Sequence, residues 1–128
     1  MKPNPVVWFE IYVQDLARAR KFYETVLQCT LEPLLPDGEA GGLQMLAFPM
    51  DMDASGSGGA LVKMPDSPPA AGLGTLVYFA CEDCAVEQGR VEAAGGTIFK
   101  SKFSIGQYGH CALVTDTEGN TVGLHSMQ

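Results

Sequence analysis

The chain has 128 residues, 46% of them hydrophobic and 18% charged, which is ordinary for one globular domain. The formal net charge of -7 argues against nucleic acid and anionic membrane surfaces as partners, because both repel an acidic protein. No apolar run reaches the roughly 20 residues that a membrane-spanning helix needs. The first residues lead into a strand-like segment and not into a secretory leader, so we expect a cytoplasmic protein.

The first half of the chain predicts one strand, one helix and three further strands. Residues 6–13 alternate as a strand does, with Trp8, Glu10 and Tyr12 on one face and Val7, Phe9, Ile11 and Val13 on the other. Asp15 suits the N-cap of a helix, and that helix should cover the Val7 face with one apolar stripe, formed by Leu16, Ala19, Phe22, Tyr23, Val26 and Leu27. Short strands are expected around residues 29–34, 43–48 and 60–64. The Gly- and Ser-rich segment 51–59 predicts a solvated loop, since it lacks the ligand spacing of a calcium-binding EF-hand.

The second half repeats this order. A proline-rich linker is predicted over residues 65–72, then a strand over 73–81 and a helix capped by Asp83 that reaches Ala94. Strands over residues 97–102, 109–115 and 121–126 follow, the last after a tight turn at 116–120. Asp15 and Asp83 lie 68 positions apart, so the chain reads as two βαβββ modules, 6–64 and 73–127. Modules this small are marginal alone, so we expect one paired domain with its ligand site between the modules.

The four cysteines are expected to be free thiols. Cys81 and Cys84 form a C-x-x-C pair, which could indicate redox or metal chemistry. The repeat favours a core role instead, because at the same offset they match Val13 and Leu16, and a buried free cysteine behaves as a small hydrophobe. A second ligand pair for zinc is missing from the sequence.

Three segments resemble the glyoxalase/bleomycin-resistance/dioxygenase superfamily, also called vicinal oxygen chelate proteins. They are VQDLARARKFY at residues 13–23, EAAGG at 92–96 and DTEGN at 116–120, and the resemblance covers nearly the whole chain. It implies an α+β fold in which two βαβββ modules form a half-open mixed β-barrel around a ligand cavity. It also implies a homodimer.

The resemblance also implies where a metal would be held. Metal-dependent members place a histidine on the first strand, where this chain has Trp8, and the equivalent position in the second module is Leu76. The last-strand glutamate corresponds to Gly123, and the fourth-strand position, within residues 58–63, corresponds to Leu61. Tryptophan, leucine and glycine side chains cannot donate a lone pair to a cation. We therefore expect no metal at the usual site and no cofactor.

The residues expected to line the cavity instead are Trp8, Glu10, Tyr12, Tyr78, Gly123 and His125. Aromatic rings with a carboxylate and an imidazole suit a small, partly apolar ligand, including a cationic one. Glu10 is the candidate general acid or base, because a carboxylate among aromatic side chains must be paired, protonated or reached by water. The alternative for these residues is that the rings simply fill the barrel. Gln107, Tyr108 and Gly109 are expected at the rim.

The preferred hypothesis is a metal-independent, bleomycin-resistance-like protein that binds a small molecule. The second is a lyase, isomerase or dioxygenase that holds a metal through relocated ligands, with Glu10, His110 and His125 as candidates. The third is a non-catalytic dimeric scaffold with a filled barrel. The fold alone does not decide among them, since this architecture hosts unrelated reactions.

Overall fold

The computed structural model describes residues 4–34, 42–65 and 74–128. The chain forms two compact units: residues 8–75 make one, and residues 1–7 with 76–128 make the other. The boundary falls within the first strand, so its first two residues group with the second unit. The predicted linker over residues 65–72 lies outside the described residues except for Pro65. Neither helix of the described segments is long and apolar enough to cross a bilayer.

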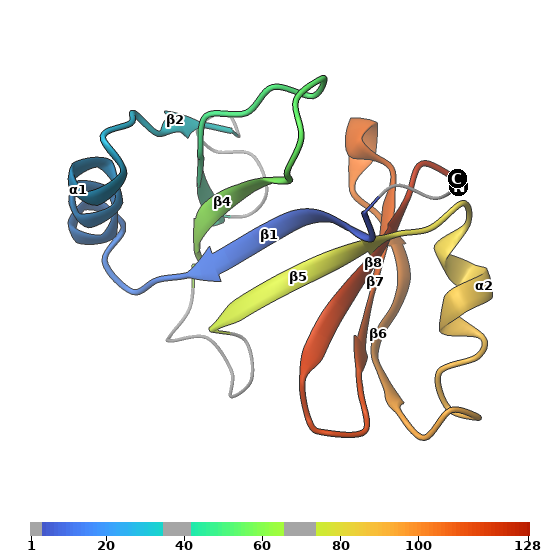
Figure 1. Ribbon diagram of the computed structural model, residues 1–128. Helices are drawn as coiled ribbons and strands as arrows, with labels where there is room; N and C mark the ends of the chain where they lie inside the picture. Colours follow the sequence, from blue (N-terminus) through green and yellow to red (C-terminus); the bar gives the residue numbers. More distant parts are fainter. Residues whose placement is uncertain (1–3, 35–41, 66–73) are drawn as a thin grey trace. The chain divides into compact units, whose positions relative to one another are not determined.

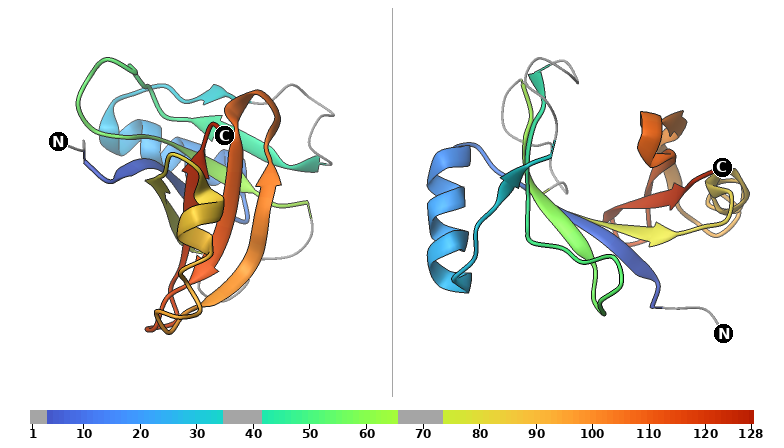
Figure 2. Two further views of the ribbon diagram at one scale, coloured as in Figure 1. Left: turned by 90° about the vertical axis from the view of Figure 1, so that its right-hand side faces the viewer. Right: turned by 90° about the horizontal axis from the view of Figure 1, so that it is seen from above.

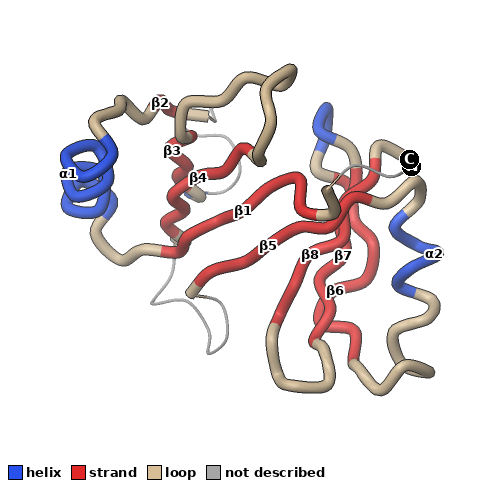
Figure 3. The backbone as a smooth tube through the Cα atoms, in the orientation of Figure 1, coloured by secondary structure: helices blue, strands red, loops and turns tan. Residues whose placement is uncertain are grey.

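The unit of residues 8–75 contains β1 (Val6–Tyr12), α1 (Leu16–Leu27), β2 (Glu32–Pro33), β3 (Gln44–Ala47) and β4 (Gly58–Lys63). Its strands are ordered β2-β3-β4-β1, with β1 parallel to β4 and the other pairs antiparallel. Helix α1 lies beside this sheet in Figures 1 and 2. The long loop between β3 and β4, tan in Figure 3, is exposed from residue 49 to residue 57. The predicted loop over residues 51–59 is therefore confirmed except at its end, where Gly58 and Gly59 belong to β4.

The other unit contains β5 (Thr75–Ala80), α2 (Cys84–Gln88), β6 (Thr97–Ser104), the 3-10 turn η2 (Gly106–Tyr108), β7 (His110–Thr115) and β8 (Thr121–Ser126). Its strands are ordered β5-β8-β7-β6. Strand β5 is parallel to β8, and β7 is antiparallel to both of its neighbours. Helix α2 runs along one face of β6, β7 and β8 (Figures 1 and 2). Both units thus have the predicted βαβββ order.

Each unit has its own hydrophobic core under its helix. In the first, Leu31, Leu46 and Leu61 are buried, with Ile11, Val13 and Leu16 packed against them. In the second, Cys84, Ala112, Val114 and Leu124 are buried, with Phe79 and Cys81 packed against them. The even-numbered residues of β1 therefore lie on the face away from α1, as their alternation predicted.

Both predicted N-caps are confirmed. The Asp15 carboxylate accepts a hydrogen bond from the backbone N–H of Arg18 at 3.0 Å, and that of Asp83 accepts one from Ala85 N–H at 3.0 Å. Each bond satisfies one of the N–H groups that the first turn of a helix leaves without an intrahelical partner. The two helices therefore begin where the sequence predicts.

Two helix predictions are wrong in detail. The second helix does not reach Ala94: it ends at Gln88, and residues 89–95 form turns, with i to i+3 bonds such as Val91 N–H to Gln88 O. Gly89 stands at that end, and glycine favours a helix less than other residues except proline. The apolar stripe of α1 is also divided, since Phe22, Val26 and Leu27 are 59%, 60% and 56% exposed and only its other half meets the core.

Candidate functional site

Strand β1 presents a carboxylate between two aromatic donors. Trp8 Nε1 donates to Glu10 Oε2 at 3.2 Å, and Tyr12 Oη donates to Glu10 Oε1 at 2.6 Å. The three side chains share a face because they stand two residues apart on a strand. Glu10 is only 8% exposed, so these bonds offset part of the cost of burying its carboxylate. The structure therefore brings together Trp8, Glu10 and Tyr12, and both aromatic residues orient the acid between them.

Glycines on the neighbouring strand make room for the aromatic rings of β1. Trp8 pairs with Gly58, where an added Cβ would lie 3.1 Å from the indole ring. Phe9 pairs with Gly59, and a Cβ there would overlap the phenyl ring. A glycine within a strand commonly marks such a close approach. Gly58 and Gly59 thus leave space for two aromatic rings, one on each face of the sheet. The sequence did not indicate this role, because both glycines fell in the predicted loop 51–59, whereas they begin β4.

The second unit repeats this arrangement and carries the other predicted site residues. Tyr78 pairs with Gly123, and a Cβ at Gly123 would overlap the phenol ring. His125 stands two residues further along β8, so it lies on the same face as Gly123. Its Nε2 lies 2.6 Å from the carbonyl oxygen of Tyr108 in η2. Tyr78, Gly123 and His125 therefore form a second set, on the face of β5 and β8 away from α2.

The residues at the implied metal positions do not fit a metal. The Trp8 indole nitrogen is a donor without a lone pair, and it is already bonded to Glu10. Gly123 lies against the Tyr78 ring, and Leu76 is an apolar side chain that is 1% exposed. Leu61 is a correction: it packs in the core under α1, so on this strand Gly58, Ala60 and Val62 share the face of Trp8. None of these three offers a ligand atom.

The relocated ligand set does not converge either. His110 pairs with Ser126 and His125 pairs with Cys111, the residue next to His110. Neighbouring residues on a strand point to opposite faces, so the two imidazoles lie on opposite faces of the β7–β8 pair. Among the described residues, no group of three or more His, Cys, Asp or Glu side chains could hold a metal ion.

The C-x-x-C pair is structural in the described second unit. Cys84 is fully buried in the core under α2, as predicted, and Cys81 packs against that core. Both thiols are free. Burial first, and the Glu87 carboxylate second, raise the pKa of the Cys81 thiol to about 11. A redox nucleophile needs the opposite shift, so this environment argues against thiol chemistry.

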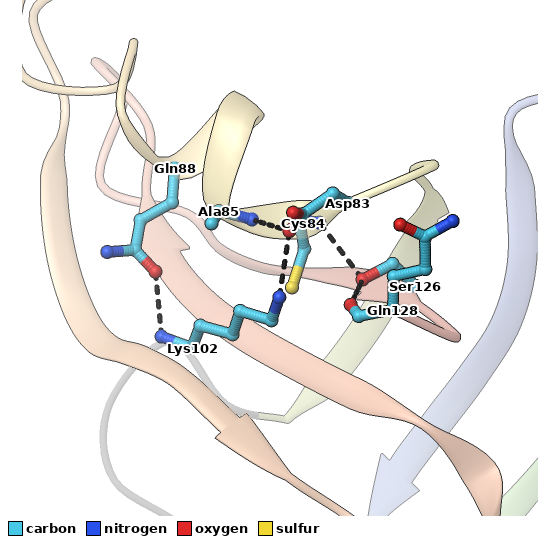
Figure 4. Close-up of polar contacts among 7 residues, drawn as sticks. All are labelled: Asp83, Cys84, Ala85, Gln88, Lys102, Ser126 and Gln128. Carbon is cyan, nitrogen blue, oxygen red and sulfur yellow. Dashed lines mark hydrogen bonds and ion pairs between the residues drawn. The ribbon is translucent and has the colours of Figure 1, made fainter.

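Polar contacts at the start of α2 hold that helix to its sheet. Figure 4 shows the Asp83 carboxylate between Ala85 N–H and Lys102 Nζ, the second at 2.8 Å. These partners, Lys102 first, lower the pKa of Asp83 below its usual value. Ser126 Oγ accepts from Cys84 N–H at 2.9 Å and donates to Gln128 O at 2.7 Å. These contacts cap the start of α2 and fix the end of β8, so the cluster has a structural role.

A groove of about 560 Å³ lies at the start of α1, away from the Trp8 face. Its lining is mixed: polar and charged side chains such as Gln14, Asp15 and Lys63 lie beside the apolar Leu16, Ala17 and Leu46. Lys63 Nζ already donates to the carbonyl oxygen of Gln14 at 2.8 Å. The groove has no carboxylate–aromatic arrangement like that of β1, so we assign it no role.

Comparison with known proteins supports the fold and the resemblance. The family model described as bleomycin resistance protein-like N-terminal matches residues 6–45. Comparison with curated protein sequences gives no match.

Solved structures match nearly the whole chain. Methylmalonyl-CoA epimerase from Mycobacterium tuberculosis is 16% identical, with a TM-score of 0.68, over 97% of this chain and 88% of that one. A hypothetical protein from Bacillus halodurans C-125 is 14% identical, with a TM-score of 0.72, over 99% and 96%. A Streptomyces coelicolor methylmalonyl-CoA epimerase variant in complex with 2-nitronate-propionyl-CoA is 13% identical, with a TM-score of 0.65, over 96% of each chain. At these identities the likeness shows the fold alone, and it confirms the fold class that the sequence predicted.

Proposed function

We propose, from the premise that the chain belongs to the glyoxalase/bleomycin-resistance/dioxygenase superfamily, that it binds a small, partly apolar molecule without the help of a metal ion. The observation that carries the proposal is the buried Glu10 carboxylate held between Trp8 and Tyr12 on β1. Burying a carboxylate is costly, and here two aromatic donors keep it in place. Such an arrangement gives a ligand both ring surface and a directed acceptor.

The matching face of the second unit supplies the other residues of the proposal. Tyr78, which is 8% exposed, and the half-buried His125 lie on the face away from α2. We infer that the ligand-binding residues are Trp8, Glu10 and Tyr12 in one unit, and Tyr78, Gly123 and His125 in the other. Metal independence is supported by the donor chemistry at Trp8, Leu76 and Gly123, which cannot ligate a cation. The residues of β4 on the face of Trp8, which are Gly58, Ala60 and Val62, offer no ligand atom either.

A thermal-shift screen tests the proposal. Probes should include small aromatic compounds, organic cations and CoA thioesters, the last because a solved neighbour was captured with methylmalonyl-CoA. A bound molecule raises the apparent melting temperature of the folded state. For the strongest probe, Glu10→Gln should weaken binding about tenfold, the size expected when a charged hydrogen-bond acceptor is lost. Glu32→Gln, on the exposed strand β2, is the matched control and should bind as the wild type does.

Two other outcomes would replace the proposal. Stoichiometric metal in protein purified without chelator would favour the metal-dependent lyase, isomerase or dioxygenase. No shift with any probe would favour the scaffold with a filled barrel. Tyr12→Phe removes one hydrogen-bond donor to Glu10 and keeps the aromatic ring. Weaker probe binding in this variant would therefore be due to the lost orientation of the Glu10 carboxylate and not to a lost ring.

We also propose a homodimer in the cytoplasm. The superfamily resemblance supports the dimer, and four cysteines outside any disulfide suit a reducing compartment. Light scattering of the purified protein tests the first statement, and fractionation of the source cells tests the second.

A further inference from the structure

We propose that His125 recognises a hydrogen-bond donor on the ligand through the lone pair of Nδ1, while its Nε2–H group is committed to the Tyr108 carbonyl. This inference rests on the proposed function and specifies it. It assigns each nitrogen of the imidazole one role, and it names a chemical class: small molecules that pair a flat apolar part with an O–H or N–H donor.

The partner of Nε2 fixes the tautomer. Nε2 of His125 lies 2.6 Å from the backbone oxygen of Tyr108. A carbonyl oxygen has only lone pairs, so the nitrogen must carry the hydrogen of this bond. In a neutral imidazole the other nitrogen then has the free lone pair. Nδ1 of His125 is therefore an acceptor.

The position of His125 makes that acceptor usable. His125 is half-buried, so part of its ring is open to solvent. His125 pairs with Cys111 and Ala80 and follows Gly123 by two residues. Alternate residues on a strand are about 7 Å apart. A molecule that contacts the exposed part of Tyr78, which is 8% of this residue, could therefore place a donor at His125.

The loop that accepts from Nε2 is built to hold its position. Two glycines with positive φ, Gly106 at 72° and Gly109 at 103°, stand at either end of the turn η2. Ile105 N–H donates to Gly109 O at 2.8 Å, and Gly106 N–H donates to Ser104 Oγ at 3.1 Å. These bonds place the Tyr108 carbonyl, which in turn orients the imidazole. The same bond connects the loop to β8, so loss of Nε2–H should loosen the loop.

Two near-isosteric variants separate the two roles. In His125→Gln the new side-chain amide reaches the ε position, so it can keep the bond to Tyr108 while removing the acceptor at δ. His125→Asn does the reverse, because its amide oxygen stands at the δ position and its side chain is too short for Tyr108. Amide exchange at Ile105 and Gly109 should therefore speed up in His125→Asn and stay near wild type in His125→Gln.

Phenol and anisole serve as probes, because they share a ring and only phenol donates a hydrogen bond. We expect long-range proton–nitrogen NMR to show the Nε2–H tautomer for neutral His125, with His110→Gln used to assign the signals. Phenol at millimolar concentration should shift the Nδ1 signal and anisole should not. The preference for phenol should fall about three- to tenfold in His125→Gln, the size of one neutral hydrogen bond.

Three outcomes would overturn the inference. An Nδ1–H tautomer removes its premise. Equal effects of phenol and anisole at His125, with both still shifting the Trp8 indole signal, would leave the proposed function standing and remove this role of His125. No response to either probe at His125 or at Trp8 would count against both. The His110 ring, on the opposite face of the β7–β8 pair, is the internal control, since its signals should not respond.

Discussion

The phenol ring of Tyr78 lies directly against Gly123 on the neighbouring parallel strand, so that a Cβ at this glycine would overlap the ring. Phe9 and Gly59 make the same contact between the parallel strands of the other unit. In both units a strand aromatic thus occupies the space above a strand glycine, an arrangement that also pins the register of the pair.

This contact predicts that Gly123→Ala is destabilising. The added methyl group forces the Tyr78 ring out of place, and overpacking of this kind costs about 1–3 kcal/mol. Urea unfolding measures the change in the free energy of unfolding. Gly74→Ala is the control: an added Cβ there meets nothing within 4 Å, so stability should change by less than about 1 kcal/mol.

A double variant distinguishes overlap from a general effect of the substitution. If the ring is the obstacle, Tyr78→Ala should remove most of the extra cost of Gly123→Ala, so the two changes should not be additive. Additive losses would mean that the alanine acts through something other than Tyr78.

Ser126→Ala should destabilise the start of α2. Ser126 is 1% exposed, and its hydroxyl accepts the backbone N–H of Cys84 (Figure 4). Without the hydroxyl, this buried N–H loses its acceptor, which costs about 1–3 kcal/mol. Ser104→Ala is the matched control, because the Ser104 hydroxyl also accepts a backbone N–H but is exposed, and its loss should cost less than about 0.5 kcal/mol. Equal free energies of unfolding for the two variants would contradict the role of the Ser126 hydroxyl as the acceptor for Cys84 N–H.

Local patterns in the sequence predicted most of the secondary structure. Period-two alternation placed Trp8, Glu10 and Tyr12 on one face of β1, because alternation is a property of a single strand. Asp15 and Asp83 marked the helix starts, since an N-cap bonds only to its own first turn. The two βαβββ units followed from repeating these local signals.

Features that depend on pairing between distant strands were not predicted. The close contacts of Phe9 with Gly59 and of Tyr78 with Gly123 require the register of β1 with β4 and of β5 with β8. No local sequence pattern specifies that register. The same is true of Leu61, whose face depends on its pairing with Ile11. The bond from His125 to Tyr108 joins β8 to a loop 17 residues earlier, so the sequence could place both residues near the site but not in contact.

Asp83 should make stability depend on pH in the acid range. Its folded-state pKa is below the usual 3.8, because Lys102 and the Ala85 N–H stabilise the carboxylate. The contribution of Asp83 is therefore fully present above pH 3.8 and is lost as the pH falls through the lowered folded-state value. In Asp83→Asn this contribution is absent, so the variant should be less stable at neutral pH and should approach the wild type in acid.

Urea unfolding between neutral pH and about pH 2 measures this difference. Asp15→Asn is the control, since Asp15 caps α1 and takes part in neither of the two ion pairs found among the described residues. A gap between wild type and Asp83→Asn that stays constant with pH would contradict the role of the charge.

Cys81 should react slowly with alkylating reagents at neutral pH. Its pKa is raised to about 11 by burial and by the Glu87 carboxylate, so almost none of the reactive thiolate is present at about pH 7. Rates of iodoacetamide labelling, followed by peptide mass spectrometry between about pH 7 and pH 11, report the apparent pKa of this thiol. Glu87→Gln removes the neighbouring charge, so it should move the midpoint toward 9.0 and raise the labelling rate at about pH 8.

Glu92→Gln, at an exposed position in the turns after α2, is the control and should leave the pH profile of Cys81 labelling unchanged. A wild-type midpoint near 9.0 would reopen the redox interpretation of the C-x-x-C pair, because Cys81 would then be no less acidic than an ordinary thiol.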